Sequence, residues 1–327
     1  MQAHPGNHGR PVSREELVIL ALGLIPGLGP FSLRLLAEYL RIENIGFEEL
    51  VRNRPDVMRR AGIHPDVSRA LRGMEKALRR AEQITRLCER RALGWIGPFD
   101  PDYPNLLTRF HGASAPWFLF YHGDRSILNS NRSLGIVGTR EPVEKSALLA
   151  ELLAGEAAGA GMTVISGGAR GIDLAAHRGA LQGGCTIIVP ASGMTLMRPP
   201  ADLKRVMAHP RTLTISEFPP DEPGTKSTPI QRNRMVAALS DALFVVETGL
   251  RGGTLHTVRF AREFGKPILV LDHAPETNPP GNASLLATVA HRVPACAPDH
   301  ATALFIKASA QGRNLASHLP PGHPSLF

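Results

Sequence analysis

Two patterns of hydrophobic and polar residues divide the chain near residue 131. Beyond that point, short apolar runs alternate with longer amphipathic stretches, which predicts strands connected by helices. The apolar runs are continuous, as expected of parallel strands buried on both faces, so the pattern predicts an α/β fold with a mostly parallel sheet over 131–300. The predicted strands cover 134–138, 162–167, 185–190, 212–217, 242–247, 267–272 and a short segment near Arg292, and the predicted helices cover 142–160, 172–181, 231–239 and 254–264.

The residues before the sheet predict a small helical domain over 13–91. Ser13 and Glu16 have the spacing of a capping box, and an apolar run follows them directly. That run ends in Pro-Gly-Leu-Gly-Pro at 26–30, before a second apolar helix. The pattern is typical of a helix-hairpin-helix (SAM-like) module, whose glycines let backbone N–H groups approach a phosphate. An ordinary turn between two helices of a bundle fits the same residues.

Three other segments are predicted to have little regular structure. Residues 1–12 are polar and interrupted by Pro and Gly, which predicts a disordered tail. Turn-forming residues mark 92–130 as a connector that packs on the core and contains a short strand at 117–121. Residues 301–327 are too few for a further domain such as a winged helix, and we expect a flexible tail.

The composition excludes several classes of protein. An apolar fraction of 43% is ample for a buried core, and three widely spaced cysteines argue against a disulfide framework or a zinc cluster. The chain contains no run of about 18 apolar residues, so no membrane span is predicted. The N-terminus lacks the apolar segment of a signal peptide, so we expect a cytoplasmic protein with no membrane partner.

The net charge of +8 is concentrated in one part of the helical region. Residues 52–91 contain twelve Lys and Arg against five Asp and Glu, a surplus of seven. Such a segment is either a solvated helix face or a surface for nucleic acid or an acidic protein.

Glycine and arginine follow the first two predicted strands of the sheet. Ligands of an open parallel sheet gather at the carboxyl ends of its strands, so these loops are candidate binding sites. Glycine admits a ligand close to the backbone, a helix start supplies free N–H groups, and arginine suits a phosphate. The candidate phosphate-binding residues here are Gly138, Thr139 and Arg140 in the first loop and Gly167, Gly168, Arg170 and Gly171 in the second.

Two later loops have similar chemistry. Arg232, Asn233 and Arg234 begin a predicted helix, where one arginine is expected to face the ligand and the other an internal acid such as Glu217 or Glu247. The turn containing Gly252, Gly253 and Thr254 forms another plausible phosphate nest. Asp173 is expected to be an acid at a helix start, where the helix dipole stabilises its negative charge, and His177, one turn later, is expected to be structural.

The same loops lack a catalytic set. The chain contains no GxSxG elbow, no HExxH metal motif and no GxxxxGK[ST] loop, and acidic residues are sparse at the strand ends. We therefore predict a protein that binds phosphates without cleaving them, with no catalytic residues, no metal and no cofactor.

Several segments together resemble the DNA-processing protein A (Smf) family. They occur in the family's order, over about 132–290: GIVGTR, VISGGARGIDLAAHRGAL, ISEFPP, QRNRMVAALSDALFVVE, RGGTLHTVRFAREFGKPILVL and GNASLL. The resemblance implies a Rossmann-like core that binds single-stranded DNA, loads the recombinase RecA, often in natural transformation, and forms a homodimer. It places Arg140 in the DNA-binding pocket together with the glycines of the loops and the Arg-Asn-Arg motif, and it adds Lys226 in the loop ahead of that motif.

Two departures from the family pattern bear on these implications. Gly252-Gly253-Thr254 stands where the family usually has Ser-Gly-Ser, and the segment 193–210 lacks the usual Tyr-Pro step. The first departure partly matches the PGGxGTxxE-like run of another group in the same superfamily. The alternative function is therefore a sensor of nucleotide derivatives or an enzyme that cleaves a nucleotide at its ribose.

Overall fold

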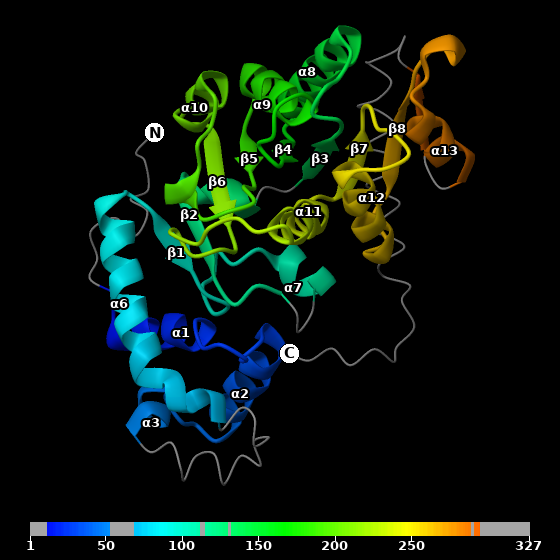
Figure 1. Ribbon diagram of the computed structural model, residues 1–327. Coiled ribbons are helices and arrows are strands. Elements are labelled where there is room, and N and C mark those ends of the chain that lie inside the picture. Colours follow the sequence, from blue (N-terminus) through cyan, green and yellow to red (C-terminus); the bar gives the residue numbers. More distant parts are fainter. Residues whose placement is uncertain (1–11, 53–68, 112–114, 130–131, 289–290, 295–327) are drawn as a thin grey trace. The chain divides into compact units, whose positions relative to one another are not determined.

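The computed structural model describes residues 12–52, 69–111, 115–129, 132–288 and 291–294. The chain forms two compact units (Figure 1). Unit 1 consists of residues 1–103 and 111–121, and unit 2 consists of residues 104–110 and 122–327. Apart from Val12, the predicted tails lie outside the described residues, as does much of the basic segment that begins at residue 52.

Unit 1 is mainly helical. Its helices are α1 (Arg14–Gly23), α2 (Pro30–Ile42), α3 (Phe47–Arg52), the short 3₁₀ helix η1 (Leu71–Gly73) and α6 (Met74–Arg90). The predicted capping box begins α1: the Glu16 N–H donates to Ser13 Oγ at 3.1 Å, and the Ser13 N–H donates to Glu16 Oε2 at 2.7 Å. In the turn that follows, Gly27 has φ +85° and Gly29 is the N-cap of α2.

A short antiparallel strand pair follows these helices. β1 (Gly94–Ile96) pairs with β2 (Leu119–Gly123), so the strand predicted at 117–121 lies two residues later. The Trp117 indole N–H donates to Ile19 O at 2.8 Å, which attaches this pair to α1. The predicted connector also contains the helix α7 (Asn105–His111) and the 3₁₀ helix η3 (Arg125–Asn129).

The strands of unit 2 are parallel, as the continuous apolar runs predicted. Their order is β6-β5-β4-β3-β7-β8-β9. Every residue of β3, β4, β5, β6 and β7 is buried, because helices cover both faces of the sheet. The strand bounds are β3 (Ser133–Val137), β4 (Thr163–Ser166), β5 (Thr186–Ile188), β6 (Thr212–Ser216), β7 (Ala242–Val245), β8 (Ile268–Asp272) and β9 (His291–Pro294).

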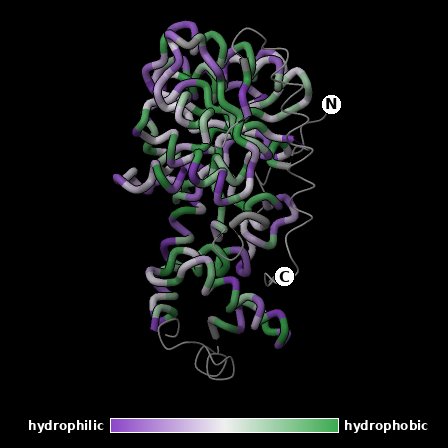
Figure 2. Tube along the Cα trace, turned by 90° about the vertical axis from the view of Figure 1, so that its right-hand side faces the viewer, coloured by the Kyte–Doolittle hydropathy of each residue, from purple (hydrophilic) through white to green (hydrophobic). Residues whose placement is uncertain are grey.

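The helices of unit 2 form a layer on each side of the sheet (Figure 1). α8 (Glu144–Gly159) and α9 (Ile172–Gly183) lie on one face, and α11 (Thr228–Leu239) and α12 (Gly253–Glu263) lie on the other. Figure 2 shows the hydrophobic residues of this unit concentrated in its interior. Shorter elements complete the unit: η4 (Met194–Leu196), α10 (Ala201–Met207), η5 (Pro275–Thr277) and α13 (Pro280–Thr288).

Glycines allow α8 and α9 to pack with their backbones in contact. A Cβ atom at Gly179 would lie 1.9 Å from the Glu151 carbonyl oxygen, and one at Gly183 would lie 2.6 Å from the Gly155 carbonyl oxygen. No side chain fits in that space. The Ala- and Gly-rich composition of the two helices therefore fixes their spacing, and through it the position of the loop that precedes α9.

Candidate nucleic-acid interface

The candidate site lies where the strand order of unit 2 reverses. From β3, the next strands along the chain continue on one side as β4, β5 and β6, and on the other side as β7, β8 and β9. Ligands of open α/β sheets bind outside the carboxyl ends of the strands at such a point. The loops there are joined by backbone hydrogen bonds: the Thr139 N–H donates to Glu247 O at 2.8 Å, and the Ile172 N–H donates to Thr139 O at 3.2 Å.

The loop after β3 leaves Arg140 exposed. A Cβ atom at Gly138 would lie 2.5 Å from Ile172 Cγ1, so glycine is needed for this loop to meet the start of α9. The Val143 N–H, at the N-cap of α8, donates to Glu247 Oε2 at 3.1 Å, so a carboxylate already occupies one donor of that helix start. Arg140 forms no ion pair with any described residue. Its guanidinium is therefore available to an external anion.

Glycines also shape the loop after β4. Gly168 and Gly171 have φ values of +74° and +79°, which L side chains rarely adopt. A Cβ atom at Gly171 would lie 2.5 Å from Thr139 O, so the first two loops touch through their backbones. Arg170 forms an exposed ion pair with Glu141, so the carboxylate partly neutralises the charge of this arginine.

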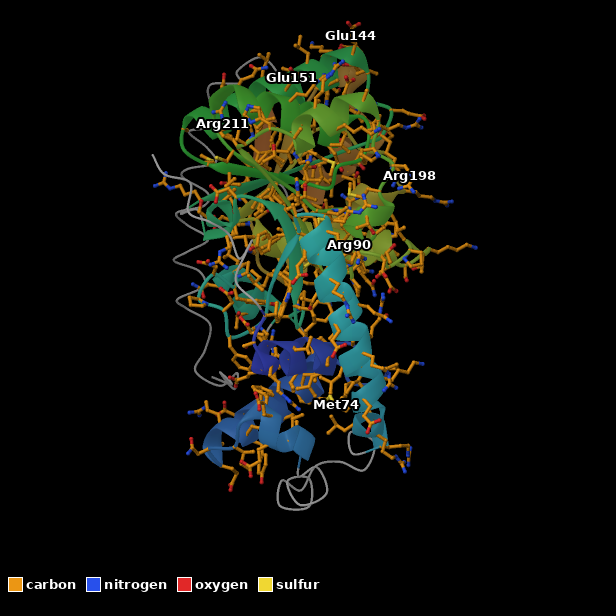
Figure 3. All side chains as sticks on the ribbon, turned by 90° about the vertical axis from the view of Figure 1, so that its left-hand side faces the viewer. Met74, Arg90, Glu144, Glu151, Arg198 and Arg211 are labelled. Atoms are coloured by element: carbon orange, nitrogen blue, oxygen red, sulfur yellow. The ribbon has the colours of Figure 1, made fainter. Side chains whose placement is uncertain are left out.

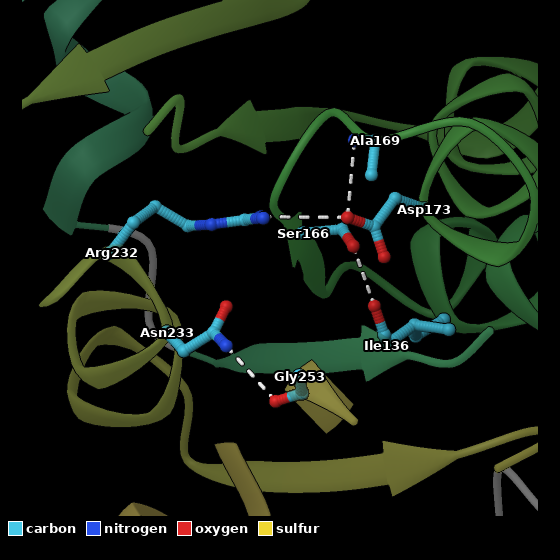
Figure 4. Close-up of polar contacts among 7 residues, drawn as sticks. All are labelled: Ile136, Ser166, Ala169, Asp173, Arg232, Asn233 and Gly253. Carbon is cyan, nitrogen blue, oxygen red and sulfur yellow. Dashed lines mark hydrogen bonds and ion pairs between the residues drawn. The ribbon is translucent and has the colours of Figure 1, made fainter. Parts of the chain in front are cut away.

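Arg232 enters this loop from α11 and is buried there, 8% exposed (Figure 4). Its Nη1 lies 3.4 Å from Asp173 Oδ2, and the same carboxylate oxygen accepts the Ala169 N–H at 3.2 Å. A Cβ atom at Gly167 would lie 0.8 Å from Arg232 Nη1, so the glycine leaves the space that the guanidinium fills. Arg232 therefore holds the loop in place from inside.

Arg234 and Asn233 also form internal contacts. Arg234 Nη2 lies 3.5 Å from Glu217 Oε2, as predicted for one arginine of the motif, but Arg232 also meets an internal acid, Asp173. The Asn233 amide donates to Gly253 O at 2.9 Å and ties α11 to the start of α12. The Arg234 side chain is 30% exposed, so it is the more accessible arginine of the motif. That one of them faces a ligand stays a prediction.

Burial shifts the pKa of two groups behind the loops, Arg232 and Glu217. Burial lowers the pKa of Arg232. The negative charge of Asp173 opposes this shift, and the positive charge of Arg140 adds to it. Burial raises the pKa of Glu217, against the influence of Arg234. Arg232 and Arg140 therefore repel each other, and an anion bound between or beside them would reduce that repulsion.

His177 is fully buried, as expected of a structural residue. Its Nδ1 lies 2.7 Å from Thr186 Oγ1, whose hydroxyl donates to Val164 O, so Nδ1 carries the proton of a neutral ring. Burial, with a further contribution from Arg232, lowers the pKa of His177 to about 3. The ring therefore stays uncharged near neutral pH.

The loop after β7 is open at the turn before α12. Gly252 is the N-cap of α12 with φ +133°, and a Cβ atom there would meet nothing within 4 Å. Gly252 and Gly253 are exposed and Thr254 is half-buried. Arg251, which was not among the predicted site residues, is exposed beside them.

Asn282 is a second residue that the sequence reasoning did not assign to the site. It is fully buried; its Oδ1 accepts the Thr248 N–H at 2.8 Å, and its amide donates to Val246 O and Leu271 O, each at 2.9 Å. It therefore fixes the loop after β7. The signal was present in the segment GNASLL, which is one of the segments shared with the family.

The structure thus brings together most of the predicted residues. The loops of Arg140, Gly171 and Gly252 lie at neighbouring strand ends, with Arg232 and Asn233 behind them. Lys226 is exposed ahead of α11, and it forms no ion pair with any residue that the structure describes. Within the described ranges, no group of His, Cys, Asp and Glu is arranged to hold a metal ion, and no helix is long and apolar enough to cross a membrane.

The fold and the site define a class: doubly wound α/β proteins with a glycine-lined, cationic loop cluster at the reversal of strand order. A model of the family DNA recombination-mediator protein A matches residues 94–304, which is more than half of the chain. The chain therefore belongs to this family of DNA recombination mediators.

Individual relatives agree with this assignment. Protein Smf from Synechocystis is 29% identical over 270 residues, 80% of this chain and 66% of that protein. A putative DNA processing protein DprA from Mycobacterium tuberculosis is 34% identical over 210 residues, 60% of this chain and 54% of that protein. The matched region thus spans about half to two thirds of the length of these relatives.

Solved structures match the fold. DNA processing protein A from Streptococcus pneumoniae has a TM-score of 0.67 at 24% identity and covers 87% of this chain and 95% of its own. DNA processing protein A from Helicobacter pylori, a single-stranded DNA-binding protein, has a TM-score of 0.57 at 26% identity and covers 66% of this chain and 96% of its own.

Proposed function

We propose that the chain binds single-stranded DNA at the strand-end loops of unit 2. The observation that carries the proposal is Arg140, an exposed cation without an ion-pair partner among the described residues, at the point where the strand order reverses. Exposed glycines, Gly252 and Gly253, lie at the neighbouring strand end, after β7. The single-stranded DNA binding of the Helicobacter pylori relative supports a nucleic-acid strand as the anion.

The candidate residues divide into two roles under this proposal. Arg140, Thr139, Arg170, Lys226 and the exposed glycines 252 and 253 contact phosphates, with Thr254 beside them. The buried Arg232 and Asn233 hold the loops in position through Asp173 and Gly253. Gly138, Gly167, Gly168 and Gly171 shape the loops by admitting the side chains and backbone packed against them, and Arg234 adds positive charge beside Glu217.

We further propose that the bound strand is protected and passed to the RecA recombinase by a homodimer, without a catalytic step. Membership of a family of recombination mediators supports the transfer. The proposal assigns no catalytic role to Arg232 or His177, because both are buried and engaged internally.

The substitution Arg140→Ala tests the site. We expect it to weaken the binding of a fluorescent single-stranded oligonucleotide at least tenfold in anisotropy titrations at fixed salt, because an arginine–phosphate contact is lost. Arg205→Ala, which removes an exposed cation of α10, is the matched control and should retain affinity. Equal affinities for the two variants and the wild type would remove Arg140 from the site.

A further inference from the structure

A row of polar, mostly basic side chains runs along one face of α6. Lys76, Arg79, Gln83, Arg86 and Arg90 recur every three or four residues, which places them on one side of the helix, and all are exposed. We call these five residues the α6 ridge. Figure 3 shows side chains projecting along α6 between Met74 and Arg90. At 1.5 Å per residue the ridge extends over about 21 Å.

The opposite face of α6 fixes the orientation of the ridge. Met74, Ala77, Ala81, Ile84 and Cys88 are buried, so α6 is held by an apolar stripe. The ridge lies about half a turn away from that stripe and therefore faces solvent.

The charges of the ridge are largely unmatched. Arg86 pairs with Glu82 at 3.3 Å, but both side chains are at least half exposed, and such a pair contributes little. Lys76, Arg79 and Arg90 form no ion pair with any described residue. Residues 69–91 contain eight Lys and Arg against three Glu, a surplus of five.

Folding alone does not explain this arrangement. Like charges three or four residues apart, such as Arg86 and Arg90, repel each other and destabilise a helix. An alternation of acids and bases would keep the helix as soluble without that cost. The ridge therefore points to an anionic ligand with charges repeated along a line.

We propose that the α6 ridge binds the phosphodiester backbone of a nucleic acid, without reading its sequence. This inference rests on the proposed function, because it gives the same class of ligand, nucleic acid, a separate binding surface in unit 1. A strand with duplex geometry carries a phosphate about every 3.4 Å, so a 21 Å row of cations meets several of them. The ridge contains no aromatic residue on which a base would stack, which favours contact with phosphates.

The test compares two full-length variants with the same change in charge. The ridge variant changes its four cations to Gln: K76Q, R79Q, R86Q and R90Q. The control variant changes four exposed cations of α10 and α12: K204Q, R205Q, R259Q and R262Q. Binding of fluorescent single-stranded and duplex oligonucleotides is measured by anisotropy over a range of salt concentrations, and circular dichroism verifies that both variants are folded.

We expect the ridge variant to lose at least tenfold in affinity at low salt. The slope of log K against log salt for the single strand should fall by about 2 to 3, since each lost phosphate contact contributes about 0.7. The control variant should lower the slope by less than 1. Loss confined to one of the two oligonucleotides identifies which form of nucleic acid the ridge holds.

Two results would overturn the proposal. One is a ridge variant whose salt dependence coincides with that of the control variant. The other is unchanged oligonucleotide binding together with lost binding of fluorescent poly-glutamate, which would make an acidic polypeptide the partner. The Arg140→Ala variant separates this proposal from the proposed function. If Arg140→Ala binds oligonucleotides normally while the ridge variant binds them weakly, only the strand-end site is contradicted. If Arg140→Ala binds weakly while the ridge variant binds normally, only the ridge proposal is contradicted.

Discussion

At the residue scale, the positive charge of Arg232 depends on one carboxylate. Both side chains of the Arg232–Asp173 pair are 9% exposed, so water screens neither charge. Removing one partner of a buried pair leaves an uncompensated charge in a medium that solvates it poorly. The same contact positions the loop after β4, because Asp173 also accepts the Ala169 N–H.

Asp173→Asn should therefore destabilise the protein by about 3–5 kcal/mol, measured as the free energy of unfolding in urea. Asp202→Asn is a matched control, since Asp202 pairs with Arg205 at 3.2 Å while the two side chains are 52% and 81% exposed. The control should cost no more than about 1 kcal/mol. Similar losses for the two variants would mean that the buried pair is no more important than the exposed one.

The buried ring of His177 should make stability depend on pH. Its pKa is about 3 in the folded chain against 6.5 ordinarily, so between these values the unfolded chain binds a proton that the folded chain does not. The contribution of His177 is fully present above pH 6.5 and is lost as the pH falls toward 3, by up to about 1.4 kcal/mol per pH unit. Glu217, whose pKa is raised, acts in the opposite direction, since its contribution is lost as the pH rises.

His177→Asn removes the titrating group and keeps an N–H donor near Thr186. The free energy of unfolding should fall less steeply for this variant than for the wild type between pH 6.5 and pH 4. Parallel pH profiles would show that His177 does not titrate on unfolding as described.

The roles of single residues were only partly predictable from the sequence. The prediction that an arginine of the Arg-Asn-Arg motif meets an internal acid followed from spacing alone, because the two arginines cannot share one helical face. The burial of Arg232 depends on Gly167 and Asp173, which are distant in the sequence and meet it only through the fold. No local pattern contains that information.

At the element scale, apolar strands and amphipathic helices predicted the sheet well. No helix was predicted at α13, which begins with Pro280 and Gly281, residues that are typical of turns. Its position is explained by contacts outside the helix: a Cβ atom at Gly281 would lie 2.3 Å from Gly249 O, and Asn282 bonds three backbone groups. Tertiary contacts of this kind override local propensity.

The contact between α8 and α9 gives a prediction at the same scale. Gly179→Ala places a methyl group 1.9 Å from the Glu151 carbonyl oxygen, so the helices must separate. We expect a loss of about 1–3 kcal/mol in the free energy of unfolding. Gly159→Ala, at the end of α8, meets nothing within 4 Å and should be neutral or slightly stabilising. A tolerated Gly179→Ala would show that the two helices are not held at the distance described.

At the scale of the whole molecule, each of the two units contains one of the proposed anion-binding surfaces. Unit 2 has the strand-end loops around Arg140, and unit 1 has the α6 ridge. A basic surplus alone predicts an anionic partner without naming it. Family membership supports a role in recombination, and the exposed cations support phosphate as the group that we propose the protein recognises.

The most direct test of the central claim compares three ligands of the wild-type chain at one fixed salt concentration. Single-stranded DNA, duplex DNA of the same length and free nucleotides are titrated against the protein, since affinities for nucleic acids have meaning only at a stated salt. The account predicts the tightest binding for single-stranded DNA. Tighter binding of free nucleotides than of the single strand would contradict it and favour a sensor or enzyme of nucleotide derivatives.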